Sequence, residues 1–433
     1  MITFNRVKTL KGKIRVPSDK SITHRAFIFS SIATGKSIIY RPLVSADIEA
    51  TIGILKNLGI QILLEDGNAV VISKGYKNFV ECENVLDCMN SGTTARLVLG
   101  LLAPQKKYYV LTGDNSLINR PMDRVVKPLK KLGAVIFARK NNCYLPATVV
   151  PSNMKGGVID AEVHSAQVKS AVILAGIQIE EEVVYRELVQ TRNHTENMAV
   201  LFGADVKVIK EDRQKNIMVK YKSSLKSASI EIPGDFSSAA FFIAAAYIFN
   251  DSEIIIRDCG INETRTAFLT VLNKMGASIE IRNKRDNYEP IGDIYTCYKR
   301  LNGVKISGDI IPNLIDELPI MAVLGIFAND PVEVRDAKEL RFKESDRIGA
   351  IVENLNSLGV DIEEYEDGFK VYPLENLNIE KDIVLKSFGD HRIAMLNILL
   401  AKRFGERVKI DDINSIKVSN PFFLELLKKL EGV

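Results

Sequence analysis

The 433-residue sequence predicts an α/β protein of two similar domains, each built from three β-α-β-α-β-β units. A first observation is a large apolar residue followed by Gly, repeated along the chain at intervals of 70 to 83 residues. A second is an Ala-rich apolar stretch within each repeat. Six repeats at one period indicate six copies of one supersecondary unit, and a chain of this length divides into two cores. The repeated glycines are Gly59, Gly133, Gly203, Gly276, Gly359 and, more weakly, Gly432.

One helix of each unit ends at its repeated glycine. Gly after a helix provides the left-handed turn that returns the chain into a strand, and alternating segments such as IQI (60–62) follow. These helices place Lys, Asn and Glu on one side. We therefore expect them to cover the outside of each domain.

The second helix of each unit is apolar on most faces and is expected inside the domain. Its N-terminus carries small polar or charged residues. Because a helix N-terminus exposes unpaired N–H groups and a partial positive charge, it favours anions. The six starts are Lys20-Ser21, Asn90-Ser91-Gly92-Thr93, His164-Ser165-Ala166-Gln167, Asp235-Phe236-Ser237-Ser238, Asp316-Glu317 and Gly389-Asp390-His391-Arg392.

We expect the domains to comprise residues 16–232 and residues 1–15 plus 233–433, with an active site in the cleft between them. The net charge of +4 comes from basic residues scattered among acids, so a small anionic ligand fits better than a nucleic acid. Five cysteines without a CxxC pair and four histidines without a metal-ligand spacing predict no metal site. No cofactor is predicted. The N-terminus lacks a signal core and no apolar run reaches about 18 residues, which predicts a cytoplasmic protein without membrane spans.

The basic residues near the N-terminus can be interpreted either as a ligand site or as ordinary parts of a helix. Gly35-Lys36-Ser37 does not complete a phosphate-binding loop, since Ser30 stands where that loop needs Gly, and we interpret it as a helix-to-strand turn. Ser21 can cap the helix, and Arg25 lies four residues on, near the same face. A capped helix with solvated cations is the alternative to a ligand site.

Three further segments concentrate groups that bind anions. Gly92 lets a ligand approach backbone N–H groups, and Arg120 opens another helix where its fork can hold a carboxylate or phosphate. The segment RFKESDRI gathers charges that would otherwise form a solvated face. A plain N-cap is the alternative at Asn90-Ser91-Gly92-Thr93.

Acid–base groups stand at two starts. Asp316-Glu317 precede a wholly apolar helix, where capping and catalysis are both compatible with the sequence, and His391 titrates near neutrality if unperturbed. A core histidine is the alternative. Together the segments predict a transferase or lyase that acts on multiply anionic small molecules by acid–base chemistry.

The motifs, taken in order, resemble those of the EPSP synthase family over nearly the whole chain. They are PSDKSITHRA, NSGTTARL, NRPMDRV, HSAQVKSA, TRNHTENM, GDFSSAA, DELPIMA, RFKESDRI and GDHRIAM. The resemblance implies an inside-out α/β barrel in each domain and no cofactor. It implies attack of the 5-hydroxyl of shikimate 3-phosphate on C2 of phosphoenolpyruvate, protonation of the methylene carbon and loss of phosphate. We expect a monomer.

The resemblance also implies residue roles. Asp316 corresponds to the proton acceptor from the 5-hydroxyl and Glu344 to the proton donor, assisted by Lys20 and His391. Burial in a closed site would have to raise the pKa of such an acid. Residues implied to bind shikimate 3-phosphate are Lys20, Ser21, Arg25, Ser165, Ala166, Gln167, Arg192, Asp316 and Lys343. Those implied to bind phosphoenolpyruvate are Lys20, Asn90, Gly92, Thr93, Arg120, Gln167, Arg347 and Arg392.

Two features qualify the resemblance. Many relatives carry a lysine where this chain has Val418, with Lys417 one residue earlier, so neither is assigned to the site. Gly92 keeps the glycine of glyphosate-sensitive members.

Two alternatives remain. The sister family that uses UDP-N-acetylglucosamine presents a cysteine in the loop before Arg120-Pro121, and residues 114–119 contain none. A repeat-built protein of the related RNA cyclase type would predict a basic stripe and salt-dependent RNA binding.

Overall fold

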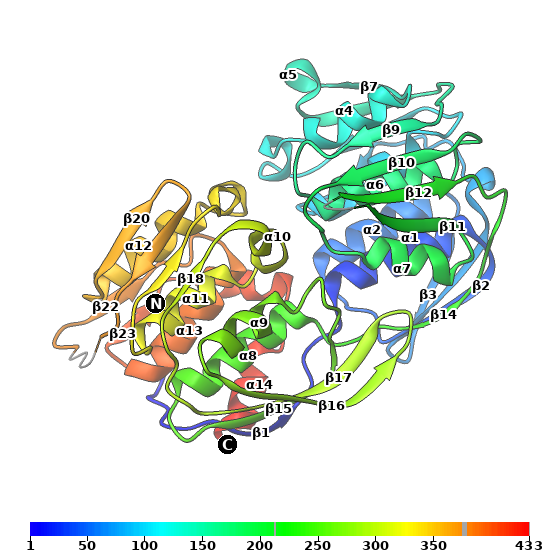
Figure 1. Ribbon diagram of the computed structural model, residues 1–433. Helices are drawn as coiled ribbons and strands as arrows, with labels where there is room; N and C mark the ends of the chain where they lie inside the picture. The colour runs from blue at the N-terminus through cyan, green and yellow to red at the C-terminus, as the bar shows by residue number, and fades with distance from the viewer. Residues whose placement is uncertain (212–213, 375–378, 433) are drawn as a thin grey trace. The chain divides into compact units, whose positions relative to one another are not determined.

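A computed structural model describes residues 1–211, 214–374 and 379–432 of the chain. The chain divides into two compact units, one of residues 18–232 and one of residues 1–17 and 233–433. Each unit contains inner helices wrapped by outer helices and sheets (Figure 1). This is the mixed α/β architecture of repeated units that the sequence predicts.

The unit of residues 18–232 contains three repeats. The first comprises α1 (Lys20–Ile32), β2 (Ala33–Tyr40), α2 (Ala46–Asn57), β3 (Gln61–Glu65) and β4 (Asn68–Lys74). The second comprises β5 (Leu86–Asp87), α3 (Gly92–Leu102), β6 (Tyr109–Thr112), α4 (Asp123–Lys131), β7 (Val135–Ala138), the short α5 (Arg139–Asn142) and β8 (Tyr144–Val150). The third comprises β9 (Gly157–Asp160), α6 (Ala166–Gly176), β10 (Val183–Glu187), α7 (His194–Leu201), β11 (Asp205–Glu211) and β12 (Gln214–Lys220).

The sheets of these repeats share one topology. Their strand orders are β5-β6-β8-β7 and β9-β10-β12-β11, in which the first pair is parallel and the others are antiparallel. The first repeat obtains its leading strand from the end of the unit, where β13 (Leu225–Lys226) and β14 (Ser229–Glu231) pair parallel with β2. The two ends of the unit are thereby joined in one sheet.

The unit of residues 1–17 and 233–433 repeats this plan. Its first sheet takes the N-terminal strand β1 (Lys11–Ile14), which pairs parallel with β15. The repeat continues with α8 (Phe236–Ile248), β15 (Glu253–Gly260), α9 (Ala267–Lys274), β16 (Ser278–Asp286) and β17 (Pro290–Cys297). The next comprises β18 (Val304–Ile306), the short α10 (Ile311–Leu314), α11 (Leu318–Ile326), β19 (Val332–Val334), α12 (Arg347–Ser357), β20 (Ile362–Tyr365) and β21 (Gly368–Val371). The last comprises β22 (Ile383–Leu385), α13 (His391–Phe404), β23 (Val408–Ile410) and α14 (Phe423–Glu431).

The last repeat is shorter than the others. Its sheet has the two strands β22 and β23, and the chain reaches its final helix α14 where the other repeats continue into a hairpin. This agrees with the weaker glycine signal at Gly432. The other two sheets of the unit keep the order of the complete repeats, β1-β15-β17-β16 and β18-β19-β21-β20.

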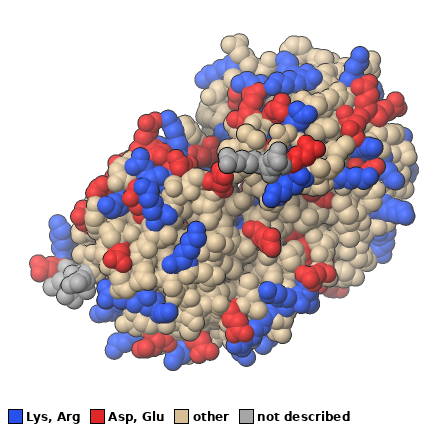
Figure 2. Space-filling model, viewed as in Figure 1, with Lys and Arg blue, Asp and Glu red and all other residues tan. Residues whose placement is uncertain are grey.

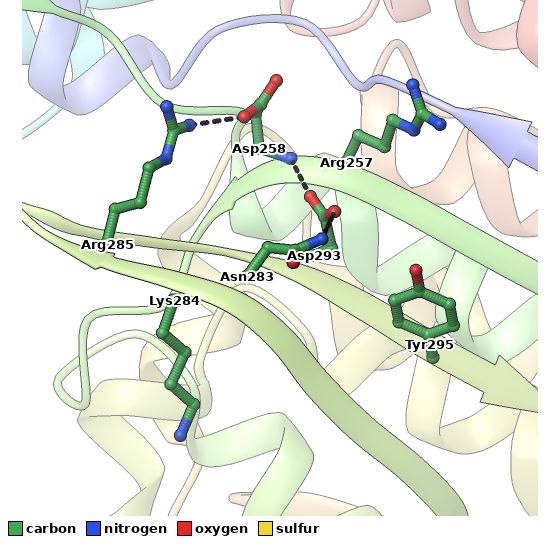
Figure 3. A pocket seen from close by; sticks show the side chains of 7 residues that line it. All are labelled: Arg257, Asp258, Asn283, Lys284, Arg285, Asp293 and Tyr295. Atoms are coloured by element: carbon green, nitrogen blue, oxygen red, sulfur yellow. Dashed lines mark hydrogen bonds and ion pairs between the residues drawn. The ribbon is translucent and has the colours of Figure 1, made fainter.

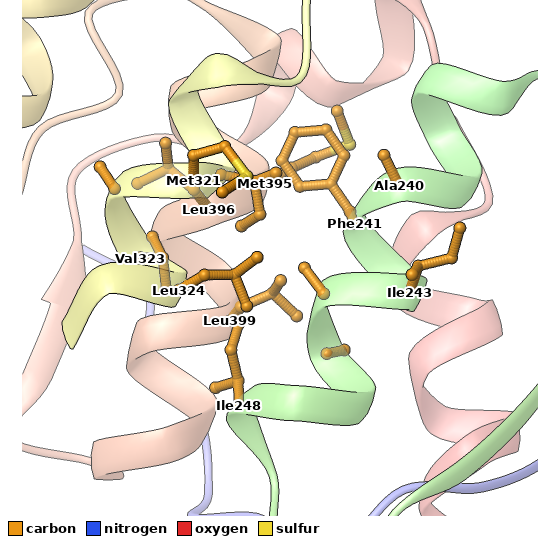
Figure 4. Close-up of a cluster of buried hydrophobic side chains, with 14 of the residues drawn as sticks. Ala240, Phe241, Ile243, Ile248, Met321, Val323, Leu324, Met395, Leu396 and Leu399 are labelled. Carbon is orange, nitrogen blue, oxygen red and sulfur yellow. The ribbon is translucent and has the colours of Figure 1, made fainter. Parts of the chain in front are cut away.

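The Ala-rich helices form the core, as the sequence predicts. Every residue of α8 and α11 is buried, and α8, α11 and α13 pack on one another. Figure 4 shows Phe241 of α8, Met321 of α11 and Met395 of α13 converging in this core. In the other unit α3 packs on both α6 and α1. The hydrophobic effect of burying these faces fixes the inner helices, so their N-terminal ends are held by packing.

The repeated glycines perform the predicted turn. All six have a positive φ between 77° and 93°, a conformation that a side chain disfavours. Strands β3, β7, β11, β16 and β20 follow the first five glycines within three residues.

Two local predictions are wrong. The cap of α1 is Asp19, whose carboxylate accepts from the backbone N–H of Ile22 at 2.8 Å, so Ser21 lies within the first turn and does not cap it. Aspartate and serine are both favoured caps, and the sequence alone does not choose between Asp19 and Ser21. Residues 35–37 lie inside β2 because β2 follows α1 directly, without a separate turn.

Candidate active site

The predicted site residues lie at or just before helix N-termini, some of them those of the inner helices α1, α3, α6, α11 and α13 and others those of the outer helices α4, α7 and α12. In the first, Lys20 opens α1 and its Nζ lies 3.1 Å from Asp47 Oδ2, with about a fifth of its side chain exposed. The salt bridge partly balances the charge of Lys20. Asp47, in the first turn of α2, was not predicted, and only its place in an acidic helix start hinted at it.

A buried histidine supports this helix start. His24 Nδ1 contacts Thr51 Oγ1 at 2.8 Å, and Thr51 contacts Thr94 of α3 at 2.7 Å. Burial lowers the pKa of His24 to about 3, against an opposing effect of Asp47. His24 is therefore neutral at physiological pH and connects three helices through hydroxyl groups.

The start of α3 is built around an arginine fork. Ser91 caps the helix, accepting from Thr94 N at 3.1 Å, and Gly92 is its first residue. Arg120 Nη2 donates to Asn90 Oδ1 at 2.7 Å and to Ser116 Oγ at 3.1 Å. The structure thus brings Asn90, Gly92 and Arg120 together, as predicted.

A second arginine at this helix start was missed. Arg96 Nη1 donates to Gln167 Oε1 at 2.8 Å, and its Nη2 donates to Pro121 O at 3.2 Å. Gln167 Nε2 in turn donates to Thr93 Oγ1 at 3.0 Å. The available signal was spacing, because Arg96 lies one helical turn after Gly92 and so on the same face.

The start of α6 holds Arg25 from the neighbouring helix. Ser165 caps α6, accepting from Val168 N at 3.5 Å, and Ala166 and Gln167 are its first two residues. Arg25 is 4% exposed and donates to Ser170 Oγ and Thr195 Oγ1, both at 2.7 Å.

Arg192 completes the predicted set of this unit. It stands in the loop that joins β10 to α7, two residues before the first residue of α7, and it is partly exposed. The buried Arg25 and the Arg192 loop are therefore tied to the same two helices, α6 and α7.

In the unit of residues 1–17 and 233–433, Asp316 is surrounded by guanidinium groups. Its carboxylate lies 3.6 Å from Arg392 Nη2, 3.7 Å from Arg347 Nη1 and 3.9 Å from Arg265 Nη1. Arg265, which is 3% exposed, comes from the loop before α9 and had no sequence signal. The next residue, Glu317, is fully buried and accepts from Ser237 Oγ at 2.5 Å.

Arg347 is held by a buried aspartate. Its Nε donates to Asp390 Oδ2 at 2.8 Å, and both residues are almost wholly buried. Burial alone would raise the pKa of Asp390, but the charges of Arg347 and His391 hold this pKa below its ordinary value. Asp390 also caps α13, accepting from Arg392 N at 2.8 Å, so one carboxylate orients two arginines.

Several of the arginine N–H groups lack an acceptor. Nη1 of Arg347 and both Nε and Nη1 of Arg392 are buried and have no hydrogen-bond partner among the described residues. Buried polar groups in proteins are nearly always hydrogen-bonded. These donors are therefore positioned to receive an anion.

The remaining predicted residues, Glu344, Lys343 and His391, are neighbours in the sequence of Arg347 or Arg392. Glu344 accepts from Arg347 Nη2 at 2.6 Å, and a third of its side chain is exposed, so it lacks the burial that the sequence argument required of an acid. Lys343 lies 3.9 Å from Glu339, and desolvation lowers its pKa. His391 is the first residue of α13 and is 4% exposed.

A surface pocket of about 490 Å³ lies over the sheet of β15, β16 and β17 (Figure 3). Asp293 and Tyr295 alternate with the buried Ile294 along β17, so they point to the outer face of the sheet. Asp293 accepts from Asp258 N and Asn283 Nδ2, at two residues with left-handed backbones. The pocket contains none of the predicted site residues.

Two kinds of feature are absent from the described ranges. No helix there has the length and apolar character that crossing a bilayer requires. No group of three or more His, Cys, Asp or Glu side chains in these ranges is placed to hold a metal ion. On the face that Figure 2 shows, Lys and Arg lie interspersed with Asp and Glu and form no stripe.

Comparison with known proteins identifies close relatives. The family profile described as EPSP synthase (3-phosphoshikimate 1-carboxyvinyltransferase) matches residues 4–427. Proteins named 3-phosphoshikimate 1-carboxyvinyltransferase from Petrotoga mobilis and Aquifex aeolicus are 41% and 43% identical to the chain, over the full length of both sequences. A solved structure of EPSP synthase from Acinetobacter baumannii is 34% identical, with a TM-score of 0.86, covering 99% of this chain and 97% of that one.

A more distant structure extends the fold. The enolpyruvyl transferase NikO from Streptomyces tendae superposes with a TM-score of 0.79 at 14% identity, over 98% of this chain and 96% of that one. At this identity the likeness concerns the fold alone.

Proposed function

The chain belongs to the EPSP synthase family and transfers the enolpyruvyl group of phosphoenolpyruvate to the 5-hydroxyl of shikimate 3-phosphate. We propose that the residues at the starts of its inner helices and of the outer helices α4, α7 and α12 perform this reaction. The observation that carries the assignment of roles is the set of buried N–H groups on Arg347 and Arg392 without acceptors among the described residues. Both substrates are anions with the oxygens that such donors need.

Phosphoenolpyruvate binds to arginines and a helix start. Arg120, Arg347 and Arg392 hold its carboxylate and phosphate, and Lys20 adds a point charge. The N–H groups at Gly92 face the ligand, with Asn90, Thr93 and Gln167 shaping the site.

Shikimate 3-phosphate binds mainly to residues of α1, α6 and the Arg192 loop. Ser165 and Arg192 contact its phosphate, and Lys20, Ser21 and Arg25 form the adjoining surface with Ala166 and Gln167. Lys343 and Asp316 hold the hydroxyl side of the ring. The buried hydrogen bonds of Arg25 keep this surface rigid before the ligand arrives.

Asp316 is the proton acceptor. When it takes the proton of the 5-hydroxyl, the oxygen attacks C2 of phosphoenolpyruvate. The three guanidinium groups within 3.9 Å stabilise the carboxylate before the reaction and the developing anionic charge during it.

Glu344 is the proton donor to the methylene carbon. In this structure Arg347 pairs with its carboxylate, so phosphoenolpyruvate must take over part of the Arg347 fork before Glu344 can carry a proton. Attack at C2 and protonation of the methylene carbon to a methyl group give a tetrahedral intermediate. Loss of phosphate from C2 and of a proton from the adjacent methyl carbon then restores the double bond and gives the enolpyruvyl ether. Lys20 and His391 assist the charge and proton movements.

The decisive experiment measures phosphate release by the purified protein with both substrates and with each substrate omitted in turn. Release should require both, and Arg392→Ala should abolish most of it. Release that persisted without shikimate 3-phosphate would contradict the proposal.

We further propose that the enzyme works as a monomer in the cytoplasm, on small molecules and without a nucleic-acid partner. The interspersed charges of Figure 2 support the absence of such a partner. Light scattering coupled to size-exclusion chromatography measures the mass of the protein directly, and a value near 48.2 kDa is expected for a monomer.

A further inference from the structure

A fully buried lysine lies one helical turn into α6. The side chain of Lys169 is 1% exposed, and its ammonium group contacts Glu187 Oε1 at 3.0 Å, Glu196 Oε1 at 2.8 Å and the backbone oxygen of Thr191 at 3.2 Å. Three acceptors match the three hydrogens of the ammonium group. We refer to Lys169, Glu187 and Glu196 as the buried triad.

The two glutamates of the triad differ in what their second oxygen does. Glu187 Oε2 accepts from Thr191 Oγ1 at 2.8 Å and from Thr191 N at 3.3 Å. Glu196 Oε2 is buried without a hydrogen-bond partner among the described residues. The triad therefore acts on Thr191 through Lys169 and Glu187, whereas Glu196 supplies charge.

Thr191 is held at its backbone N–H, its backbone oxygen and its hydroxyl group. These contacts come from a residue at the end of β10 and a residue of α6, both buried and rigid. The next residue is Arg192. Because consecutive residues share a peptide plane, fixing both sides of Thr191 fixes where the Arg192 backbone begins.

The neighbour of Lys169 ties the same elements together. Ser170 Oγ contacts Thr195 Oγ1 at 2.6 Å and accepts from Arg25 Nη2 at 2.7 Å. Two consecutive residues of α6 thus hold Arg25, the start of α7 and the Arg192 loop. A buried charge cluster is a costly way to gain stability, since apolar residues of similar volume serve as well. The position that the triad gives to the Arg192 loop explains this buried cluster better than a gain in stability does.

We propose that the buried triad positions Arg192 for the phosphate of shikimate 3-phosphate, with Glu187 as the residue that transmits the constraint. This inference rests on the proposed role of Arg192. Lys169 and Glu187 touch neither substrate and are positioning residues.

The test compares Glu187→Gln with Glu196→Gln. Both substitutions keep side-chain volume, remove one buried negative charge and leave Lys169 paired with one carboxylate. Glu187 accepts from Lys169 with one oxygen and from both donors of Thr191 with the other. A glutamine has a single acceptor oxygen, which can face Lys169 or Thr191 but not both, so Glu187→Gln must lose part of these three contacts. Calorimetric binding of shikimate 3-phosphate alone, with thermal unfolding of each variant, separates binding from stability.

Glu187→Gln should raise the Kd for shikimate 3-phosphate about tenfold, the effect of one or two lost hydrogen bonds, while Glu196→Gln stays within twofold. Arg192→Ala should also raise it, and the double variant Glu187→Gln/Arg192→Ala should bind no more than twofold weaker than Arg192→Ala, because both changes act through one contact. If Glu187→Gln does not fold, Thr191→Val should still raise the Kd about threefold.

Two results would overturn the positioning role and leave the role of Arg192 intact. One is an equal loss of binding in the two glutamine variants. The other is normal binding by Glu187→Gln, or by a folded Thr191→Val, while Arg192→Ala is impaired. Normal binding by Arg192→Ala would instead remove the proposed role of Arg192, and the inference with it. The two failures are therefore distinguishable.

Discussion

Replacing Gly92 by Ala should weaken inhibition by glyphosate more than it weakens use of phosphoenolpyruvate. Gly92 opens α3, and a Cβ added there would lie 2.9 Å from Arg96 Nη1 and 3.7 Å from Arg120 Nη1. Ordinary contact begins near 3.4 Å, so the Arg96 guanidinium must move by about half an ångström. The hydrogen bonds from Arg96 to Gln167 and Pro121 oppose that movement.

The magnitude follows from this geometry. One extra carbon in a packed site costs about 1–3 kcal/mol, which corresponds to about a 5- to 150-fold change in a binding constant. Glyphosate is longer than phosphoenolpyruvate, so it should lose most of this energy while the substrate loses less. We expect micromolar-range inhibition of the parent enzyme and at least a tenfold weaker inhibition constant for Gly92→Ala.

The assay is phosphate release at saturating shikimate 3-phosphate with varied phosphoenolpyruvate and glyphosate. Gly53→Ala is the matched control, because a Cβ at Gly53 in α2 meets nothing within 4 Å. A parent enzyme insensitive to millimolar glyphosate would refute the reasoning. So would an undiminished effect of Gly92→Ala in an Arg96→Lys background, since the methyl group would then not act through Arg96.

Three shorter predictions concern other parts of the site. Lys20→Ala should lower kcat about 10²–10³-fold, as removal of one preorganised cation does, and a rate within threefold of the parent would contradict this. Arg120→Lys should mainly raise the KM for phosphoenolpyruvate, because a point charge replaces a fork, and a rise confined to shikimate 3-phosphate would count against it. His24 has a folded pKa of about 3 against an ordinary 6.5, so only the unfolded chain binds its proton between these values. Stability should then fall by about 1.4 kcal/mol per unit as pH drops from 6 toward 4, and His24→Asn should flatten that slope in urea titrations.

The fold was predictable because its signals are local and repeated. Each left-handed glycine follows an amphipathic helix, and each Ala-rich helix is apolar on nearly all faces, so both kinds of helix can be assigned from short windows. Residues 1–15 were expected with residues 233–433, but the strands with which β1 and β13 pair were not predictable in the same way. β1 pairs with β15 and β13 with β2 across more than 190 residues, and nothing in a window of the sequence records such a partner.

The residues of the candidate site also fall into those with a local sequence signal and those without one. The residues at helix starts were found because a start is marked by small polar residues next to an apolar run. Arg265 and Asp47 were missed, since each meets its partner only through tertiary packing. Lys169 is part of the motif HSAQVKSA, but its burial between two glutamates depends on where β10 ends and where α7 begins.

The same packing explains why the composition shows so little charge excess. Three of the proposed cations of the ligand site already have a protein carboxylate nearby: Asp47 beside Lys20, Asp390 and Glu344 beside Arg347, Asp316 beside Arg392. Some of these pairs are short hydrogen bonds, but those from Arg392 Nη2 and Arg347 Nη1 to Asp316 are 3.6 and 3.7 Å long. Nη1 of Arg347 and both Nε and Nη1 of Arg392 have no hydrogen-bond partner among the described residues. If the proposed roles hold, we expect an anionic substrate to gain by completing hydrogen bonds at guanidinium groups whose charge is already partly balanced. Selectivity then comes from the fixed directions of the arginine forks, which the capped and buried helix starts determine.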